Sequence, residues 1–268
     1  MSRDTVISGE ARLSVQVEGE AGKPWLLVAN SLASDLSMWD AQMPLLLETH
    51  RVIRWDTRGH GASSAPEGPY SFDMLVADMV AVLDHVGAER ADIMGLSLGG
   101  MTALGLGLQH PQRVGRMIVC DARADNPPPF VAGWNERIAA IREGGMAAIA
   151  EGTLARWFTP GCDAQVREKA RRMILATPQT GYTGCARALQ ELDYLKDLPG
   201  MRPPVLYVAG AEDQGAPREV MSAMAEATPR SQLAVLPGLA HLPNMENPNA
   251  FAGAVRPWLA VAASEHGA

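Results

Sequence analysis

Three residues in this sequence have the side chains and the order that nucleophilic catalysis requires. Ser97 lies at the centre of Gly95–Gly99, and Asp213 and His241 follow it along the chain. A serine hydroxyl is nearly inert at neutral pH, so it needs a histidine to take its proton and a carboxylate to orient that histidine. The chemistry that this set predicts is attack by a serine oxygen on a carbonyl carbon.

The residues around Ser97 predict a sharp turn between a strand and a helix. The apolar segment 91–94 leads into the turn, and the small-residue segment 100–106 leads out of it. A serine at the apex of such a turn has a strained backbone, and side chains two positions away would clash there, which explains Gly95 and Gly99. An ordinary turn serine is the alternative, but the complete strand–turn–helix pattern favours a nucleophile.

The candidate acid and base each follow an apolar segment of the kind that forms a buried strand. Asp213 comes after segment 205–209, and His241 comes after segment 232–236. In a parallel sheet with helical connections, serine, acid and histidine are expected in this order at the same edge. His266 is the other histidine beyond Asp213, but it lies close to the C-terminus. We therefore predict that His241 is the base.

The acid has two rivals. Glu212 is next to Asp213, and Asp121 follows another apolar segment, 117–120. An aspartate at the end of a strand is also a common turn or cap residue. The sequence favours Asp213, and Asp121 stays open as the alternative with a comparable placement.

The negative charge that develops during such an attack requires backbone N–H groups directed at it. The amide of Leu98 is expected to supply one, because it directly follows the nucleophile at the start of a helix. The second is expected from the loop Asn30–Ser34, where Leu32 is the candidate. The side chain of Leu32 can line a pocket at the same time, because the donor is its backbone.

Short segments rich in Val, Ile and Leu predict the strands that must position these residues. Most are continuously apolar, which is typical of a parallel sheet covered on both faces. Helical patterns separate them, as in residues 72–86, which Ser71 is expected to cap. This alternation predicts an α/β fold with a doubly wound, mostly parallel sheet. The predicted strands are Leu13–Val17, Trp25–Ala29, Arg51–Trp55, Asp92–Gly95, Met117–Cys120, Val205–Ala209 and Gln232–Leu236.

The alternation stops between residues 126 and 203, where helical patterns occur without a convincing strand. Prolines at 127–129 and 203–204 border this stretch. We predict that residues 126–203 form an inserted helical cap, or lid, and that residues 1–125 and 204–268 form the core.

The composition restricts the classes of partner. The chain has 268 residues, is 47% hydrophobic and carries a net charge of −7, and no basic run indicates nucleic acid as a partner. No apolar run indicates a signal segment or a membrane span, so no membrane partner is expected. The cysteines, Cys120, Cys162 and Cys185, are scattered and odd in number, which argues against disulfides and predicts the cytoplasm as the location. The oligomeric state stays open.

The sequence indicates neither a metal nor an organic cofactor. It has no His-x-x-x-His pattern, no clustered cysteines and no phosphate-binding loop, and Gly105-Leu106-Gly107 lacks the third glycine of a dinucleotide motif. Catalysis by a serine, a histidine and an aspartate needs no cofactor either.

With these residues placed, the sequence resembles the α/β-hydrolase fold superfamily over nearly its whole length. The similar segments are Gly95–Gly100, Asp56–Ser63, Gly210–Asp213 and Pro237–His241. The resemblance implies an α/β-hydrolase fold. It also implies a triad of Ser97, Asp213 and His241, with the amides of Leu32 and Leu98 as oxyanion donors.

Within that superfamily, the chain is most similar to the 3-oxoadipate enol-lactonases. The segments that carry this similarity are Asn30–Trp39, Asp56–Ser63, Gly95–Gly100 and Arg156–Thr159. The resemblance implies hydrolysis of a small ester or lactone. The segment Asp121–Pro129 differs from that of the enol-lactonases, so the exact substrate stays open.

A substrate that carries a carboxylate would need a cation in the pocket. The candidates are three arginines in the predicted lid or at its border, and three tryptophans are candidates for lining the pocket. The alternative for each arginine is exposure on the surface, and the alternative for each tryptophan is ordinary packing in the core or the lid. These residues are Arg123, Arg137 and Arg156, and Trp39, Trp134 and Trp157.

Other functions remain open. The same residues could hydrolyse a carbon–carbon bond or form peracids as a perhydrolase-type esterase. A small-molecule binding protein without catalysis is disfavoured, because it has no need of His241. An epoxide hydrolase or dehalogenase of similar fold is also disfavoured, because those enzymes use an aspartate where this chain has Ser97.

Overall fold

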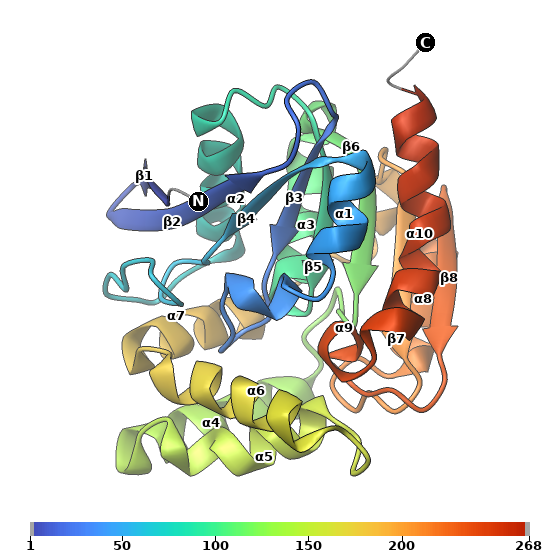
Figure 1. Ribbon diagram of the computed structural model, residues 1–268. Helices are drawn as coiled ribbons and strands as arrows, with labels where there is room; N and C mark the ends of the chain where they lie inside the picture. Colours follow the sequence, from blue (N-terminus) through green and yellow to red (C-terminus); the bar gives the residue numbers. More distant parts are fainter. Residues whose placement is uncertain (1–2, 266–268) are drawn as a thin grey trace.

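Eight strands form one sheet in the computed structural model, which describes residues 3–265 (Figure 1). They are β1 (Asp4–Ser8), β2 (Ala11–Glu18), β3 (Trp25–Ala29), β4 (Arg51–Trp55), β5 (Ala91–Leu96), β6 (Val114–Cys120), β7 (Val205–Gly210) and β8 (Ser231–Leu236). Their order is β1-β2-β4-β3-β5-β6-β7-β8, with antiparallel pairing from β1 to β4 and parallel pairing from β4 to β8. The expected doubly wound, mostly parallel sheet is confirmed.

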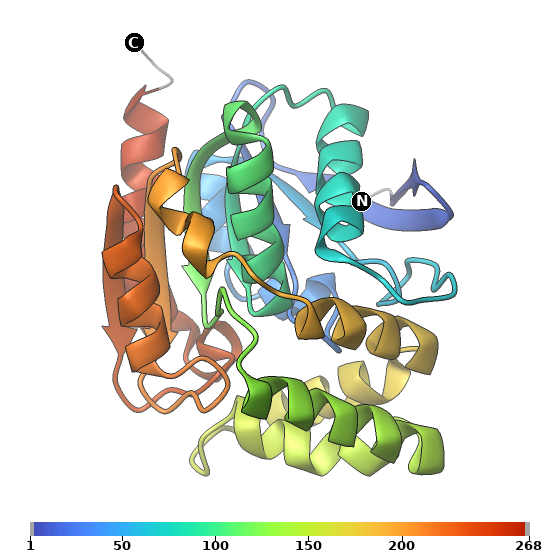
Figure 2. The same ribbon diagram turned by 180° about the vertical axis from the view of Figure 1, so that it is seen from behind.

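Helices cover both faces of this sheet. Helices α1 (Met43–Thr49) and α10 (Pro248–Glu265) lie on one face, and α2 (Phe72–His85), α3 (Leu98–Gln109) and α8 (Arg218–Ala227) lie on the other (Figures 1 and 2). As expected, Ser71 caps α2, because its hydroxyl accepts a hydrogen bond from the Met74 N–H at 3.2 Å. Short helical turns complete the core: η1 (Leu36–Trp39), η2 (Pro111–Arg113), η3 (Leu195–Gly200) and α9 (Pro243–Glu246).

The parallel strands end at a common edge of the sheet. Ala29 lies opposite Gly95, Leu96 lies opposite Cys120, and Gly210 lies opposite Leu236. The loops that follow β3, β5, β6, β7 and β8 therefore leave the sheet side by side. Each of the sequence-predicted reacting groups lies on one of these loops.

Four helices connect β6 to β7 and lie beyond this edge of the sheet (Figure 1). They are α4 (Pro128–Gly144), α5 (Ala147–Trp157), α6 (Ala164–Ala176) and α7 (Gln179–Gln190), which we call the lid helices. Pro127 directly precedes α4, and Gly145 ends it with a φ of +68°, which glycine adopts without strain. As Figure 1 shows, the lid helices lie over the ends of the strands.

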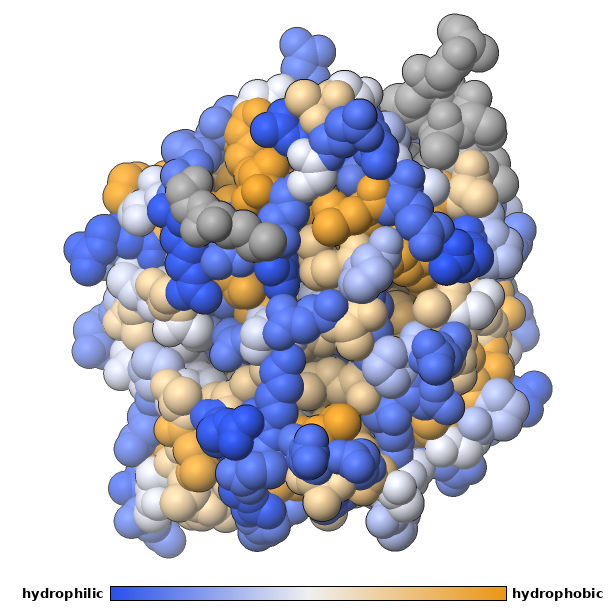
Figure 3. Space-filling model, viewed as in Figure 1, coloured by the Kyte–Doolittle hydropathy of each residue, from blue (hydrophilic) through white to orange (hydrophobic). Residues whose placement is uncertain are grey.

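The apolar side chains of the chain are largely buried. Trp39, Trp55, Tyr207 and Phe251 are the largest of those that are fully enclosed in the described residues. On the face drawn in Figure 3, hydrophilic residues are interspersed with small hydrophobic areas. Within residues 3–265 there is no helix with the length and apolar character that crossing a membrane requires. His266 lies outside the described residues.

Among the strands and the helices of seven or more residues, three were missed by sequence reasoning. Strand β1 is short and mainly polar, and it pairs only with β2 at the edge of the sheet. Helix α1 has seven residues, which is too short for a clear helical period. Helix α8 buries only Met221 and Met224 among its residues, so it carries a narrow apolar stripe.

Candidate active site

Ser97 occupies a strained turn between β5 and α3. Its backbone has a φ of +54° and a ψ of −116°, a region that residues other than glycine rarely adopt. A Cβ atom on Gly95 would lie 2.3 Å from the backbone oxygen of Gly99, and one on Gly99 would lie 2.3 Å from the backbone oxygen of Ala29. Both glycines are therefore required by the close approach of β3, β5 and α3, which directs the serine hydroxyl out of the turn.

Ser97, His241 and Asp213 form a continuous line of hydrogen bonds. The Nε2 atom of His241 lies 2.9 Å from the Oγ atom of Ser97, and its Nδ1 atom lies 2.8 Å from Oδ2 of Asp213. The carboxylate of Asp213 also accepts hydrogen bonds from the N–H groups of Gly215 at 2.7 Å and Ala216 at 3.2 Å. These donors stabilise its negative charge and fix its orientation. The arrangement can transfer a proton from the serine to the histidine.

Asp121 lies in the same cavity but does not contact His241. It is fully buried, and its Oδ1 atom accepts a hydrogen bond from the Gly210 N–H at 2.7 Å. Burial and the nearby charge of Asp213 raise the pKa of Asp121 well above its ordinary value of 3.8. The other rival, Glu212, has an exposed side chain. The structure therefore brings Asp213, and neither alternative, to the histidine.

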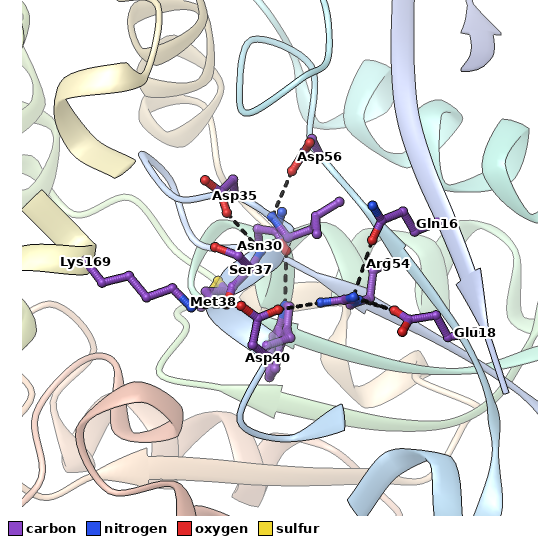
Figure 4. A network of polar contacts seen from close by, with 12 residues as sticks. Gln16, Glu18, Asn30, Asp35, Ser37, Met38, Asp40, Arg54, Asp56 and Lys169 are labelled. Carbon is purple, nitrogen blue, oxygen red and sulfur yellow. Dashed lines mark hydrogen bonds and ion pairs between the residues drawn. The ribbon is translucent and has the colours of Figure 1, made fainter. Parts of the chain in front are cut away.

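The loop after β3 and the turn at Ser97 are held together through Asn30. The Gly99 N–H donates to the Asn30 carbonyl oxygen at 3.0 Å, and the Asn30 side chain donates to the Trp55 carbonyl oxygen at 2.8 Å. Figure 4 shows Asn30 among the polar residues of this region. Leu32, on the same loop, lines the cavity beside Ser97. In residues 3–265, neither the Leu32 N–H nor the Leu98 N–H donates to a protein acceptor.

Trp39 does not line the cavity, contrary to what we expected from the sequence. Its indole is fully buried against Phe251, with the ring centroids 6.3 Å apart. Its Nε1 atom donates to Oδ1 of Asn30 at 3.1 Å. The residue belongs to η1, whose N-terminal cap at Asp35 turns this side chain into the core. Trp39 therefore supports the loop that carries Leu32 instead of facing a ligand.

A cavity of about 340 Å³ lies between Ser97 and the lid helices. Its floor includes His241, and its lid side includes two aromatic residues that the sequence suggested, Trp134 on α4 and Trp157 on α5. Sequence reasoning missed Tyr182 on α7, which also lines it. The buried residues of α7 follow a helical spacing that includes Tyr182, Cys185, Ala186 and Leu189, so this stripe was a usable signal.

Two of the three candidate arginines face the cavity without a carboxylate partner among the described residues. Arg156 donates to the Thr153 hydroxyl at 3.2 Å, and the guanidinium of Arg137 stacks on Trp134 at 4.4 Å. Burial and the charge of Arg137 lower the pKa of Arg156 from its ordinary value. Burial raises the pKa of the neighbouring Tyr182 to about 12. The lid side of the cavity is therefore positively charged and favours an anion.

Arg123 also lines the cavity, but its charge is already neutralised. Its Nη2 atom lies 2.8 Å from Oδ1 of Asp125, and its Nε atom donates to the same oxygen at 3.0 Å. The guanidinium packs over Phe130 at 4.7 Å. This arginine joins the segment after β6 to the start of the lid.

Among the residues that the structure describes, no group of His, Cys, Asp and Glu side chains is arranged to hold a metal ion.

Comparison with known proteins identifies a matching family model and similar proteins. Residues 24–248 match the family model described as alpha/beta hydrolase fold. The chain is 36% identical to a 3-oxoadipate enol-lactonase 2 of Acinetobacter baylyi, over 94% of this chain and 95% of the relative. An enol-lactonase from Burkholderia xenovorans is 32% identical, with a TM-score of 0.89 over 96% of this chain and 100% of that chain. A malate-bound esterase from Thermogutta terrifontis is 31% identical, with a TM-score of 0.90 over 98% and 99%.

Proposed function

The chain belongs to the alpha/beta hydrolase fold family, and on that basis we propose that it is a carboxylic ester hydrolase with Ser97, His241 and Asp213 as its catalytic triad. The hydrogen-bonded line from the serine hydroxyl through the imidazole to the buried carboxylate is the observation that carries this proposal. Leu32 and Leu98 are supported as the oxyanion donors, because neither amide has a protein acceptor in the described residues, Leu98 directly follows Ser97, and Leu32 lines the same cavity as Ser97.

The proposed reaction has two halves. His241 takes the proton of Ser97 as the serine oxygen attacks the ester or lactone carbonyl, and Asp213 holds the imidazole in the required tautomer. The Leu32 and Leu98 amides stabilise the resulting oxyanion. The histidine then protonates the leaving oxygen, which produces an acyl-enzyme. Water, deprotonated by the same histidine, releases the acid and restores Ser97.

We further propose that the substrate carries a carboxylate on the side away from the reacting carbonyl. Arg137 and Arg156 line the lid side of the cavity, and neither forms an ion pair with a described residue. Both side chains are partly buried, and a substrate carboxylate would offset the cost of removing their charge from water with charged hydrogen bonds. The relatives fit this charge, because 3-oxoadipate enol-lactone and malate are both derived from dicarboxylic acids. A small anionic enol-lactone is the substrate class that these observations favour.

The lid helices complete the pocket in this proposal. They contribute Trp134, Trp157 and Tyr182, whose side chains line the cavity opposite the core. We therefore propose that residues 126–203 act as a lid that selects small substrates, while the core supplies the reacting groups. A substrate that displaces water from this cavity would strengthen the electrostatic stabilisation of the oxyanion.

Substrate turnover tests the proposed function directly. The purified protein is assayed with a muconolactone-type enol-lactone and with neutral aryl esters such as p-nitrophenyl acetate. We expect hydrolysis of both, with a higher kcat/KM for the anionic lactone. Hydrolysis of the neutral esters alone would contradict the proposed substrate class, and hydrolysis of neither would contradict the proposed reaction.

A further inference from the structure

A single carboxylate, that of Glu246, joins the lid to the loop of the proposed base. Its Oε2 atom accepts a hydrogen bond from the Ala240 N–H at 3.0 Å. Its Oε1 atom accepts one from the Thr159 N–H at 2.8 Å and another from the Thr159 hydroxyl. Ala240 directly precedes His241, and Thr159 lies just after lid helix α5. Glu246 thus holds both segments at once, although sequence reasoning did not single it out.

The other side of His241 is tied to the lid as well. The Leu242 N–H donates to the Trp157 carbonyl oxygen at 3.1 Å, at the last residue of α5. The amides on both sides of His241 are therefore occupied, one by the lid itself and one by the carboxylate that also holds the lid. A catalytic ring must be held within about 0.5 Å of its productive position, and a loop by itself rarely provides that.

Glu246 can act as a brace because α9, which carries it, is anchored in the core. The Asn244 side chain donates to the Met38 carbonyl oxygen at 2.9 Å, and the Gln42 side chain donates to the Asn244 carbonyl oxygen at 2.8 Å. Asn244 and Gln42 are both buried. The position of Glu246 is therefore set by the core, and the two segments are fastened to it.

We propose that Glu246 is a positioning residue that aligns His241 on Ser97 and couples this alignment to docking of the Thr159 end of the lid. The inference rests on the proposed function, in which His241 is the base. The side chain must be a carboxylate, because N–H donors approach both of its oxygens. A carboxamide offers one acceptor oxygen, and its NH₂ group would face an N–H donor.

The variants Glu246→Ala and Glu246→Gln, measured with p-nitrophenyl acetate, test the proposal. Lys169→Met is the matched control, because Lys169 on α6 is a second tether between the lid and the core. Its Nζ atom donates to the Ser37 carbonyl oxygen at 2.7 Å and to Oδ2 of Asp40 at 3.0 Å (Figure 4). This tether does not touch the loop of His241, so its removal loosens the lid and leaves the base in place.

We expect kcat to fall by about ten- to a hundredfold in Glu246→Ala, with little change in KM, because a displaced base slows the chemical step more than it weakens binding. Glu246→Gln should show an intermediate loss, and Lys169→Met should keep the wild-type kcat. The strongly deshielded NMR signal of the proton between His241 and Asp213 should broaden in Glu246→Ala and stay sharp in Lys169→Met.

Two results would overturn the proposal. One is a folded Glu246→Ala variant that keeps the wild-type kcat and the wild-type proton signal. If Glu246→Ala does not fold, the same result in a folded Glu246→Gln variant overturns the proposal. The other is an equal loss of kcat in Lys169→Met, which would assign the effect to loosening of the lid in general. The proton signal depends on neither Ser97 nor a substrate, so it tests Glu246 even if the proposed nucleophile is wrong.

Discussion

At the scale of single residues, the geometry of the site distinguishes two candidate acids that have a comparable placement in the sequence. Asp213 and Asp121 both follow strands and both line the cavity. The Asp213 carboxylate is oriented by two backbone N–H groups toward His241, whereas Asp121 is bound to the Gly210 N–H and has a raised pKa. Burial makes the charged form of Asp121 less favourable, and this carboxyl group does not contact His241, so we expect the two aspartates to differ in catalysis.

The replacement of Ser97 tests the nucleophile. Ser97→Ala should lower kcat/KM for p-nitrophenyl acetate by about a thousandfold or more, because the attacking oxygen is removed. The hydroxyl is small and makes one hydrogen bond, to His241, so the thermal unfolding midpoint should change little. Initial rates and circular dichroism on the same preparation check both expectations. Retained activity in a folded variant would show that the nucleophile is another residue.

Paired substitutions decide between the two acids. Asp213→Asn should lower kcat by about a thousandfold or more, because an amide stabilises the wrong tautomer of His241. Asp121→Asn keeps an oxygen for the Gly210 N–H and should cause a much smaller loss. Steady-state kinetics of both variants at one pH make the comparison. If the loss is larger at Asp121, the assignment of the acid is reversed.

At the scale of elements, the site depends on the close packing of β3, β5 and α3 and on the lid helices above them. The glycines at 95 and 99 allow backbones to approach where a methyl group would not fit. The lid helices bring together side chains from α4, α5 and α7 that are far apart in sequence. In the proposed function, the loops at the strand ends supply the reacting groups, and the helices opposite them supply the selectivity.

The arginines of α4 and α5 are tested by substrate charge. Arg156→Ala and Arg137→Ala should each raise KM for an anionic lactone by about tenfold or more and leave KM for a neutral ester nearly unchanged, since a charged hydrogen bond contributes about 1.5–3 kcal/mol. Arg123→Ala is the matched control, because Arg123 lines the same cavity but is paired with Asp125. Equal effects on both substrates would remove Arg137 and Arg156 as carboxylate anchors.

At the scale of the whole molecule, buried charged side chains affect the free energy of unfolding. The guanidinium of Arg58 binds both oxygens of the fully buried Asp78 at 2.6 Å, and this pair joins the loop after β4 to α2. Removing one partner of such a pair typically costs about 3–5 kcal/mol, because the other charge stays buried. Asp121 is a buried acid that has no such partner within residues 3–265, and it lowers stability as it ionises.

The effect of Asp121 on stability has a definite sign. Its pKa is raised in the folded state above the ordinary value of 3.8, so the folded protein binds more protons than the unfolded chain between these two values. The stability that this group contributes is complete below about pH 3.8 and is lost as the pH rises through its folded pKa. Asparagine does not titrate, so Asp121→Asn should remove this loss.

Urea unfolding between about pH 4 and pH 8 measures this effect. The free energy of unfolding of Asp121→Asn should decrease less steeply with pH than that of the wild type, by up to about 1.4 kcal/mol per pH unit. Glu212→Gln is the matched control, because Glu212 is exposed beside the same site. Parallel curves for wild type and Asp121→Asn would show that Asp121 is ionised throughout this range.

The sequence by itself determined the local features of this protein. The glycines around Ser97 and the apolar strand segments are patterns of neighbouring residues, and they were sufficient to predict the fold. The positions of Ser97, Asp213 and His241 after such segments also predicted the three side chains that the structure joins by hydrogen bonds. The family similarity supports the same fold. Weak or short elements such as β1 and α8 escaped prediction, because their local patterns carry little apolar periodicity.

Only the tertiary structure decided which distant residues meet. It placed Asp213 instead of Asp121 on His241, buried Trp39 in the core, and left Arg137 and Arg156 without a described carboxylate while pairing Arg123. It also brought Thr159 of the lid to Glu246, which lies 87 residues further along the chain. Contacts of this kind depend on how strands and helices pack, and the local conformational preferences that a sequence pattern reveals do not specify them.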